Sequence, residues 1–203
     1  MSEPRPTVFV VDDDEDVRNS LCLLMKSVSL ECEAFDSAHA FLQAYAPDRP
    51  GCLVLDIRMP GMSGLDLQER LLSMRAILPI IFITGHGDVD LAVRTLHAGA
   101  VDFIQKPFQD QALLDRIHEA LASDARNREV LAKKEEIVRR FRRLTPREAQ
   151  IMEMIVDGSA NKVIAIDLGI SERTVEIHRA RVMEKTGATS LAQLVRMAIK
   201  ARE

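Results

Sequence analysis

Over residues 7–105, short apolar runs alternate regularly with segments of helical spacing, and this alternation leaves few folds open to the chain. The apolar runs are rich in β-branched residues and lie at 7–11, 31–35, 52–55, 79–84 and 101–105. Runs that are apolar throughout are typical of strands buried on both faces, and helices between them indicate a parallel sheet covered on each side. The first half therefore predicts an α/β domain with a five-stranded parallel sheet.

Charged and polar side chains follow four of these strands. They are Asp12, Asp13 and Asp14 after the first strand, Asp56 after the third, Thr84 at the end of the fourth and Lys106 after the fifth. Parallel strands end at one edge of the sheet, so we expect these side chains to meet there. Clustered carboxylates repel one another unless a cation lies among them, and oxygen ligands favour Mg²⁺ or Mn²⁺. An ammonium and a hydroxyl beside such an ion suit a phosphoryl group.

Charge divides the chain into two parts. Residues 1–123 carry a net charge of −9 and residues 124–203 carry +5, within a total of −4 for 203 residues. Residues 110–143 hold no glycine or proline and are rich in helix formers. We therefore expect a first domain over 1–123, a helical linker over 124–143 and a second domain over 144–203. A coiled-coil linker is less favoured, because no heptad pattern is sustained.

The second domain has the pattern of a small helical module. Thr145 and Glu148 form a capping box, with proline between them at the first helical position. Further helices are expected at 161–168 and 171–186, and another begins at a capping box of Ser190 and Gln193. A short helix, a glycine turn and a capped helix are typical of a helix-turn-helix, whose second helix enters the DNA major groove.

Four motifs of the first half resemble the receiver domain of two-component response regulators, over about residues 5–123. They are Val10-Val-Asp-Asp-Asp, Asp56-Ile-Arg-Met-Pro-Gly-Met-Ser-Gly, Thr84-Gly-His-Gly-Asp and Asp102-Phe-Ile-Gln-Lys-Pro-Phe. The resemblance implies a flavodoxin-like fold in which Asp56 accepts a phosphoryl group from a sensor histidine kinase. It also implies that Asp12, Asp13, Asp56 and the backbone carbonyl of Arg58 hold the metal ion. Asp14 is then assigned to the start of the next helix, where it complements the helix dipole.

The same resemblance assigns roles to the other strand-end residues. Lys106, in an expected cis bond to proline, supplies positive charge to the transferred group, and Thr84 hydrogen-bonds this group after transfer. Phe103 then turns inward and, lacking a hydroxyl, acts through packing. The affected face comprises residues 88–98, 101–105 and 110–122, and homodimers through this face are the expected output.

Residues 144–201 resemble the four-helix LuxR-type output domain of NarL/FixJ regulators, on the FixJ branch. The motifs are Leu144-Thr-Pro-Arg-Glu, Asn161-Lys-Val-Ile-Ala and Ile170-Ser-Glu-Arg-Thr-Val-Glu-Ile-His-Arg. We expect Glu176 and either Arg179 or Arg181 at base edges, because Glu accepts from cytosine and Arg pairs with guanine. The other exposed candidate on this helix is Ile177, and His178 is expected in the core. The residues expected at DNA phosphates are Lys162, Arg173, Thr174 and Lys185.

These inferences predict a phosphorylation-activated transcription regulator that binds double-stranded DNA and RNA polymerase and is not an enzyme. A Mg²⁺-dependent phosphatase is the enzyme alternative, but Asp56-Ile-Arg-Met-Pro lacks the second Asp and the Thr of its Asp-x-Asp-x-Thr motif. A receiver that dimerises without phosphorylation is disfavoured by the complete acidic, Thr and Lys set. The basic run 139–143 is equally compatible with a DNA contact and with a helix-dipole interaction.

Two expectations concern the cellular compartment. Cys22, Cys32 and Cys52 show no metal-ligand or CxxC spacing, which favours reduced thiols over a disulfide. The longest apolar runs are too short for a membrane span, and the N-terminus lacks a signal-peptide pattern. We therefore expect a cytoplasmic protein without a membrane partner.

Overall fold

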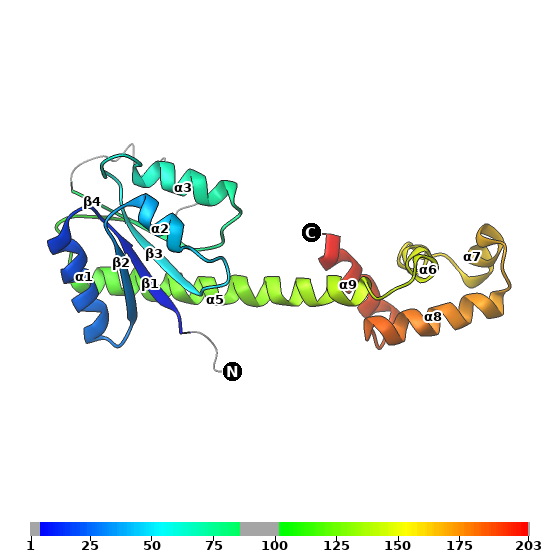
Figure 1. Cartoon of the computed structure of the whole chain (residues 1–203). Helices are drawn as coiled ribbons and strands as arrows, with labels where there is room; N and C mark the ends of the chain where they lie inside the picture. Colours follow the sequence, from blue (N-terminus) through cyan, green and yellow to red (C-terminus); the bar gives the residue numbers. More distant parts are fainter. Residues whose placement is uncertain (1–4, 86–101, 203) are drawn as a thin grey trace. The chain divides into compact units, whose positions relative to one another are not determined.

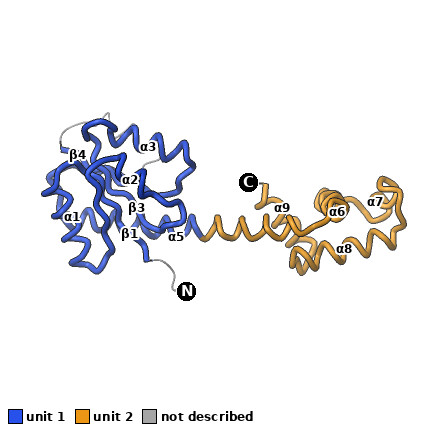
Figure 2. Tube along the Cα trace, in the orientation of Figure 1, with its two compact units in different colours: residues 1–128 blue, residues 129–203 orange. Residues whose placement is uncertain are grey.

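The computed structural model describes residues 5–85 and 102–202, within two compact units that comprise residues 1–128 and 129–203 (Figures 1 and 2). Helix α5, Asp110–Phe141, begins in the first unit and ends in the second. The predicted helix at 88–98 and the predicted strand start at Val101 lie outside the described residues. No helix in the described ranges is long and apolar enough to cross a membrane.

The first unit is built on a five-stranded parallel sheet with the order β2-β1-β3-β4-β5, which confirms the predicted α/β class. The strands are β1 Thr7–Val11, β2 Glu31–Phe35, β3 Gly51–Asp56, β4 Ile80–Thr84 and β5 Asp102–Gln105. The three inner strands are buried along their whole length, as the apolar runs predict. Strands β2 and β5 are partly exposed, because each lies at an edge of the sheet with a single neighbouring strand.

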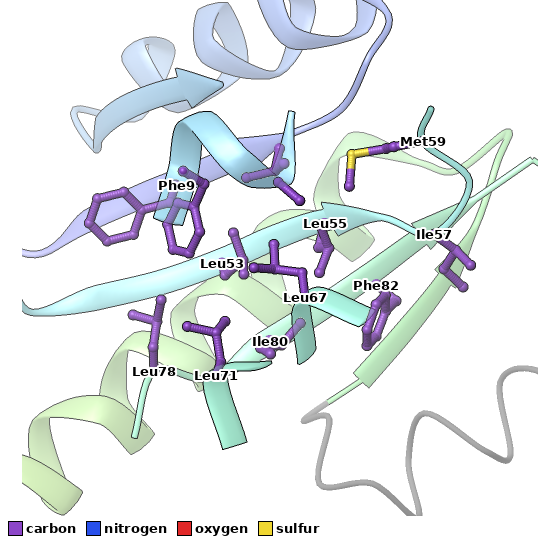
Figure 3. Packing of buried hydrophobic residues seen from close by; sticks show 13 residues of the cluster. Phe9, Leu53, Leu55, Ile57, Met59, Leu67, Leu71, Leu78, Ile80 and Phe82 are labelled. Carbon is purple, nitrogen blue, oxygen red and sulfur yellow. The ribbon is translucent and has the colours of Figure 1, made fainter. Parts of the chain in front are cut away.

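Alternate residues of the strands point to opposite faces of the sheet and contribute to two hydrophobic cores, one on each face. On one face, Phe9 and Leu53 pack with Leu67 and its neighbours (Figure 3). On the other face, Val8 packs with Leu21 and their neighbours. The helices that supply these layers are α1 Glu15–Ser27, α2 Ala38–Ala44, α3 Gly64–Ser73 and the first part of α5.

The starts of the first three helices follow from their capping residues. Asp14 caps α1 by accepting hydrogen bonds from the backbone N–H groups of Asp16 and Val17. Ser37 caps α2, and Ser63 caps α3 in a full capping box with Asp66. These side chains satisfy backbone donors that have no partner within the helix. These capping residues therefore account for where the three helices begin.

One expectation about the first unit is wrong. Cys22 of α1 and Cys32 of β2 form a disulfide, although the sequence favoured reduced thiols. The prediction rested on the absence of a recognised cysteine motif. The packing of α1 against β2 nevertheless brings the two Cα atoms to 5.5 Å, within the range a disulfide requires. Cys52, on β3, is a free and buried thiol.

The second unit is helical, as predicted. Its helices are the end of α5, α6 Pro146–Val156, α7 Asn161–Leu168, α8 Glu172–Thr186 and α9 Leu191–Arg202. The capping box of Thr145 and Glu148 is present, and Gly169 ends α7 in the left-handed conformation. The second predicted box is only half formed. The backbone N–H of Gln193 donates to the Ser190 hydroxyl, but its side chain accepts from Thr189 instead.

Candidate functional site

The carboxyl ends of the parallel strands form an acidic cleft at one edge of the sheet. Asp12 follows β1, Asp56 ends β3, Thr84 ends β4 and Lys106 follows β5. A cavity of about 400 Å³ lies between these ends and is lined by Asp12, Asp13, Asp14, Asp56, Arg58, Thr84, Gly85 and Lys106. The structure thus brings together all the residues predicted for the phosphoryl and metal site except Phe103.

One ammonium group joins the two buried carboxylates of the cleft. The Lys106 Nζ donates to Asp12 Oδ2 at 2.8 Å and to Asp56 Oδ1 at 3.1 Å. Asp12 is 1% exposed and Asp56 is 7% exposed, so their repulsion would be costly without a cation. The backbone N–H of Lys106 also donates to the Thr84 carbonyl at 2.6 Å, which anchors the lysine at the ends of β4 and β5. In this arrangement the cation between the carboxylates is the lysine itself.

Burial and hydrogen bonding act in opposite directions on the two charged groups. Burial raises the pKa of Asp56, and the hydrogen bonds from Lys106 and from the Arg58 backbone only partly offset that rise. Burial alone would lower the pKa of Lys106, but the hydrogen bonds and charges of Asp12 and Asp56 outweigh it and raise this pKa. Lys106 therefore keeps its positive charge in the cleft, where it faces any anion that enters.

The three consecutive aspartates occupy three different environments. Asp12 is buried, and its Oδ1 accepts from the backbone N–H of Asp14 at 2.9 Å. Asp13 is exposed and lines the cavity. Asp14 caps α1, so its carboxylate is committed to the helix. The assignment of Asp14 to the helix start is confirmed. Sequence reasoning missed Arg18, whose guanidinium donates to the Asp12 carbonyl at 2.8 Å and holds this loop.

The loop after β3 fixes the position of Asp56. The backbone N–H of Arg58 donates to Asp56 Oδ2 at 2.7 Å. Gly64, the first residue of α3, lies directly against this backbone, and a Cβ there would come within 2.3 Å of the Asp56 carbonyl oxygen. Only glycine permits such a close approach. Gly64 ends one of the receiver-like motifs, and its place directly after the capping Ser63 was a usable signal for this role.

The two predicted switch residues lie in different places. Thr84 is 2% exposed and lines the cleft. Phe103, on β5, is half-buried and packs against the core cluster that contains Phe82. Its inward turn after phosphorylation stays a prediction, and the adjoining helix of the predicted dimer face falls outside the described residues.

The chemistry of the donor set fits a hard divalent cation. Asp12, Asp13 and Asp56 all line the cleft and offer carboxylate oxygens. Within residues 5–85 and 102–202, no three acidic, histidine or cysteine side chains converge closely enough to enclose an ion. An ion held by part of this set would complete its coordination with water, as Mg²⁺ usually does.

The second unit presents a helix-turn-helix formed by α7 and α8. Val175 and Val182 of α8 are buried in the core of this unit. His178 is half-buried, and its Nδ1 finds no hydrogen-bond partner among the described residues. The exposed candidates for DNA contact are Lys162, Arg173, Glu176, Ile177 and Arg181, and the half-buried ones are Thr174, Arg179 and Lys185.

Two of the half-buried candidates have partners within the unit. Lys185 Nζ donates to Glu148 Oε2 at 2.6 Å and so ties α8 to α6. The hydroxyl of Thr174 is hydrogen-bonded to that of Ser171, the residue that caps α8. Contact of Lys185 with a DNA phosphate stays a prediction, and its ion pair with Glu148 favours a structural role.

Two arginines of the basic run 139–143, at the end of α5, make contacts within the second unit. Arg140 donates to Glu136 at 2.8 Å and to the carbonyl of Thr186, at the end of α8, at 3.3 Å. Arg139 also pairs with Glu136. Ile137 and Phe141, on the same helix, pack against the core of the second unit. This part of α5 is therefore an integral part of that unit.

Two family models match the chain, in agreement with its two units. The response regulator receiver domain matches residues 8–118, and the luxR family of bacterial regulatory proteins matches residues 142–198. Fold, cleft and helix-turn-helix thus define the class of two-component response regulators with a DNA-binding output. The chain belongs to this family, in which the receiver implies a sensor kinase partner and the output domain implies DNA binding.

The chain is similar to regulators of the FixJ type, as the sequence motifs predicted. The chain is 47% identical over 201 residues to the transcriptional regulatory protein FixJ of Azorhizobium caulinodans, covering 99% of this chain and 95% of that protein. It is 48% identical over 190 residues to Nodulation protein W of Bradyrhizobium diazoefficiens, covering 94% and 84% respectively. Among solved structures, the response regulator StyR matches with a TM-score of 0.86 and 47% identity, over 97% of this chain and 99% of that one.

Proposed function

We propose that Asp56 is the phosphoryl acceptor of this response regulator. The observation that carries the proposal is the pairing of Asp56 Oδ1 with the Lys106 ammonium at 3.1 Å on the wall of an open cavity. In the transfer, a carboxylate oxygen of Asp56 attacks the phosphorus of a phosphohistidine on the kinase. The P–N bond breaks, an acyl phosphate forms, and the imidazole leaves after taking up a proton. Lys106 and the Thr84 hydroxyl then lie where they can bind the phosphoryl oxygens.

We assign the metal to the same cleft. Asp12, Asp13, Asp56 and the carbonyl of Arg58 are the residues that would hold Mg²⁺ or Mn²⁺. Receiver domains generally bind Mg²⁺ at the phosphorylation site, and the oxygen-rich lining of this cleft supports the assignment. When bound, the ion screens the repulsion between the acceptor carboxylate and the incoming phosphoryl oxygens.

The proposed output is DNA binding by a dimer in the cytoplasm. Phosphorylation shifts the receiver towards homodimers through the face formed by residues 88–122, and the paired output domains bind DNA and engage RNA polymerase. Glu176 and either Arg179 or Arg181 read base edges, and Ile177 is a further DNA-contact candidate on the same helix. The exposed Lys162 and Arg173 bind phosphates, with Thr174 and Lys185 as further phosphate ligands. Loss of the phosphoryl group by hydrolysis is incidental, and the chain is not an enzyme.

The experiment that tests the acceptor is incubation of the full chain with acetyl phosphate and Mg²⁺, followed by intact-mass measurement and a DNA-binding assay. We expect a mass gain of one phosphoryl group and tighter binding to operator DNA. Asp56→Asn removes both effects, because the amide is not a nucleophile. Asp48→Asn, which changes an exposed carboxylate after α2, retains both.

Two outcomes would contradict the proposal. One is a mass gain that persists in Asp56→Asn, which would place the acceptor elsewhere. The other is an Asp56-dependent mass gain with unchanged DNA affinity, which would separate phosphorylation from the output.

A further inference from the structure

A disulfide links two neighbouring elements of the receiver. Cys22 lies on α1 and Cys32 on β2, ten residues apart, and both side chains are only partly buried against the second core. A small thiol or disulfide therefore has access to this bond. The pair belongs to none of the functions derived above.

The third cysteine does not compete for this pair. Cys52, on β3, is fully buried, and its thiol is free. Burial raises the pKa of Cys52 to about 12, so its reactive thiolate is absent near neutral pH. The pair can therefore open and close without exchanging partners within the chain.

The compartment decides what such a bond can do, and this step rests on the proposed function. A regulator that binds DNA works where the thiol pool is reducing, and disulfides in that environment are usually transient or redox-sensing. A bond that is accessible and has no internal competitor meets the requirements of a reversible one.

We propose that Cys22 and Cys32 form a reversible thiol–disulfide site that responds to the glutathione pool. In the closing reaction, the thiolate of one cysteine attacks a sulfur of oxidised glutathione and displaces one glutathione thiolate. The thiolate of the other cysteine then attacks the protein sulfur of this mixed disulfide and releases the second glutathione. Two protein thiols become one disulfide, and one glutathione disulfide becomes two thiols.

The position of the bond connects it to the acidic cleft. Helix α1 begins directly after Asp14, and the backbone N–H of Asp12 donates to the carbonyl of Phe35 at the end of β2. The disulfide thus links α1 and β2, the two elements that contact the loop of residues 12–14. Closing a loop of this length changes the unfolding equilibrium constant by roughly a hundredfold. We expect the oxidised receiver to be more stable than the reduced one by that factor.

The test titrates the full chain against glutathione buffers that range from fully reduced to fully oxidised. The samples are quenched in acid, unfolded and alkylated, and the number of alkyl groups per chain is determined by intact-mass measurement. We expect three alkyl groups at the reducing end and one at the oxidising end, with a reversible transition between them. Cys52→Ala is the matched control and loses one label at both ends while keeping the transition. In Cys22→Ser and in Cys32→Ser, the number of alkyl groups never falls by two, whatever the ratio of reduced to oxidised glutathione.

Three results would overturn the inference. They are three labels under all conditions, one label under all conditions, and a glutathione adduct on a single cysteine in place of the internal bond. The measurement involves neither a phosphodonor nor DNA. A failure here is therefore distinct from a failure of the proposed phosphoryl acceptor, which the acetyl phosphate experiment detects.

Discussion

At the scale of the residue, Glu148 shows how one buried carboxylate organises the second unit. Its Oε2 accepts from the backbone N–H of Thr145 at 2.8 Å and from Lys185 Nζ at 2.6 Å. The side chain therefore closes the capping box of α6 and also ties that helix to α8. The hydrogen bonds from Lys185 and from Thr145 lower the pKa of Glu148 to about 2. A group with this property makes the stability of its unit depend on pH.

We predict that Glu148 stabilises the folded state at neutral pH and loses this effect in acid. Because its pKa is lower in the folded than in the unfolded chain, the contribution is fully present above about pH 4.3 and disappears as the pH falls towards 2. Glu148→Gln should therefore be less stable than the wild type at pH 7, and the difference should shrink between pH 4.3 and 2.

The measurement is urea unfolding of the full chain at several pH values, followed by far-UV circular dichroism. The chain has one tyrosine, Tyr45 in the receiver, and no tryptophan, so tyrosine fluorescence reports separately on the first unit. A stability difference between wild type and Glu148→Gln that stays constant from pH 7 to 2 would contradict the prediction.

Substitutions at two residues of the helix-turn-helix can distinguish recognition of the base sequence from general affinity for DNA. Glu176 is exposed on α8, and Lys162 is exposed on α7. Glu176→Gln should change the preferred base at one position of the operator. The free energy of discrimination between bases at that position should change by about 1–3 kcal/mol. Lys162→Ala should weaken binding to all sequences and reduce the salt slope by about one. Binding measured on operator variants at several salt concentrations distinguishes the two, and identical behaviour of both variants would reject the groove assignment.

At the scale of the element, α5 is attached to the receiver by a buried ion pair. Asp124 is 1% exposed, and its Oδ2 accepts from the backbone N–H of Gly51 at 2.9 Å and from Arg128 Nε at 2.7 Å. The other guanidinium nitrogens of Arg128 donate to the carbonyls of Pro47 and Arg49. One arginine thus fixes the 124–128 segment of α5 against the loop between α2 and β3.

We predict that Arg128→Ala destabilises the receiver by about 3 kcal/mol, because it leaves a buried carboxylate without its cation. Arg128→Lys should recover only part of this loss, since an ammonium cannot serve three acceptors with the geometry of the guanidinium. Arg126→Ala, at an exposed position of the same helix, should change stability by less than about 0.5 kcal/mol.

Urea unfolding followed by the fluorescence of Tyr45 measures these differences. Equal stabilities of Arg128→Ala and Arg126→Ala would show that the contacts of Arg128 with the loop do not hold the helix in place.

The elements were predictable from the sequence where local chemistry decides them. Caps such as Ser63 and Thr145 and the apolar runs of β1 and β3 act within a few residues, and their signals lie in the chain itself. The acidic cleft was predictable because parallel strands necessarily end at the same edge. The contact of Asp124 with Gly51 joins residues 73 apart, and the disulfide depends on how α1 packs on β2. No local pattern encodes such pairings.

At the scale of the whole molecule, the two units share one polypeptide but have separate hydrophobic cores. In the proposed function, phosphorylation occurs in the first unit and DNA is bound by the second. Because each core is complete in itself, the output need not involve unfolding of either unit. Assembly of two chains is the simplest way for one unit to raise the affinity of the other for a two-part operator.

We predict that phosphorylation converts the full chain from a monomer of 22.7 kDa into a dimer. Sedimentation velocity with acetyl phosphate and Mg²⁺ should show the doubling in mass, and Asp56→Asn should remain monomeric under the same conditions. A chain that carries the phosphoryl group by mass measurement and still sediments as a monomer would exclude dimerisation as the output.

The contact of Lys106 with both Asp12 and Asp56 has a consequence for how the cleft accepts charge. Before transfer, this ammonium is neutralised by two carboxylates, one directly after β1 and one at the end of β3. A phosphoryl group offers the same ammonium several new oxygens, so Lys106 can exchange one counter-ion for another without ever being left unpaired. In the proposed transfer, Lys106 would therefore change counter-ions within the cleft. The acyl phosphate carries one more negative charge than the carboxylate it replaces, and an ammonium that is already in place pairs with part of that charge.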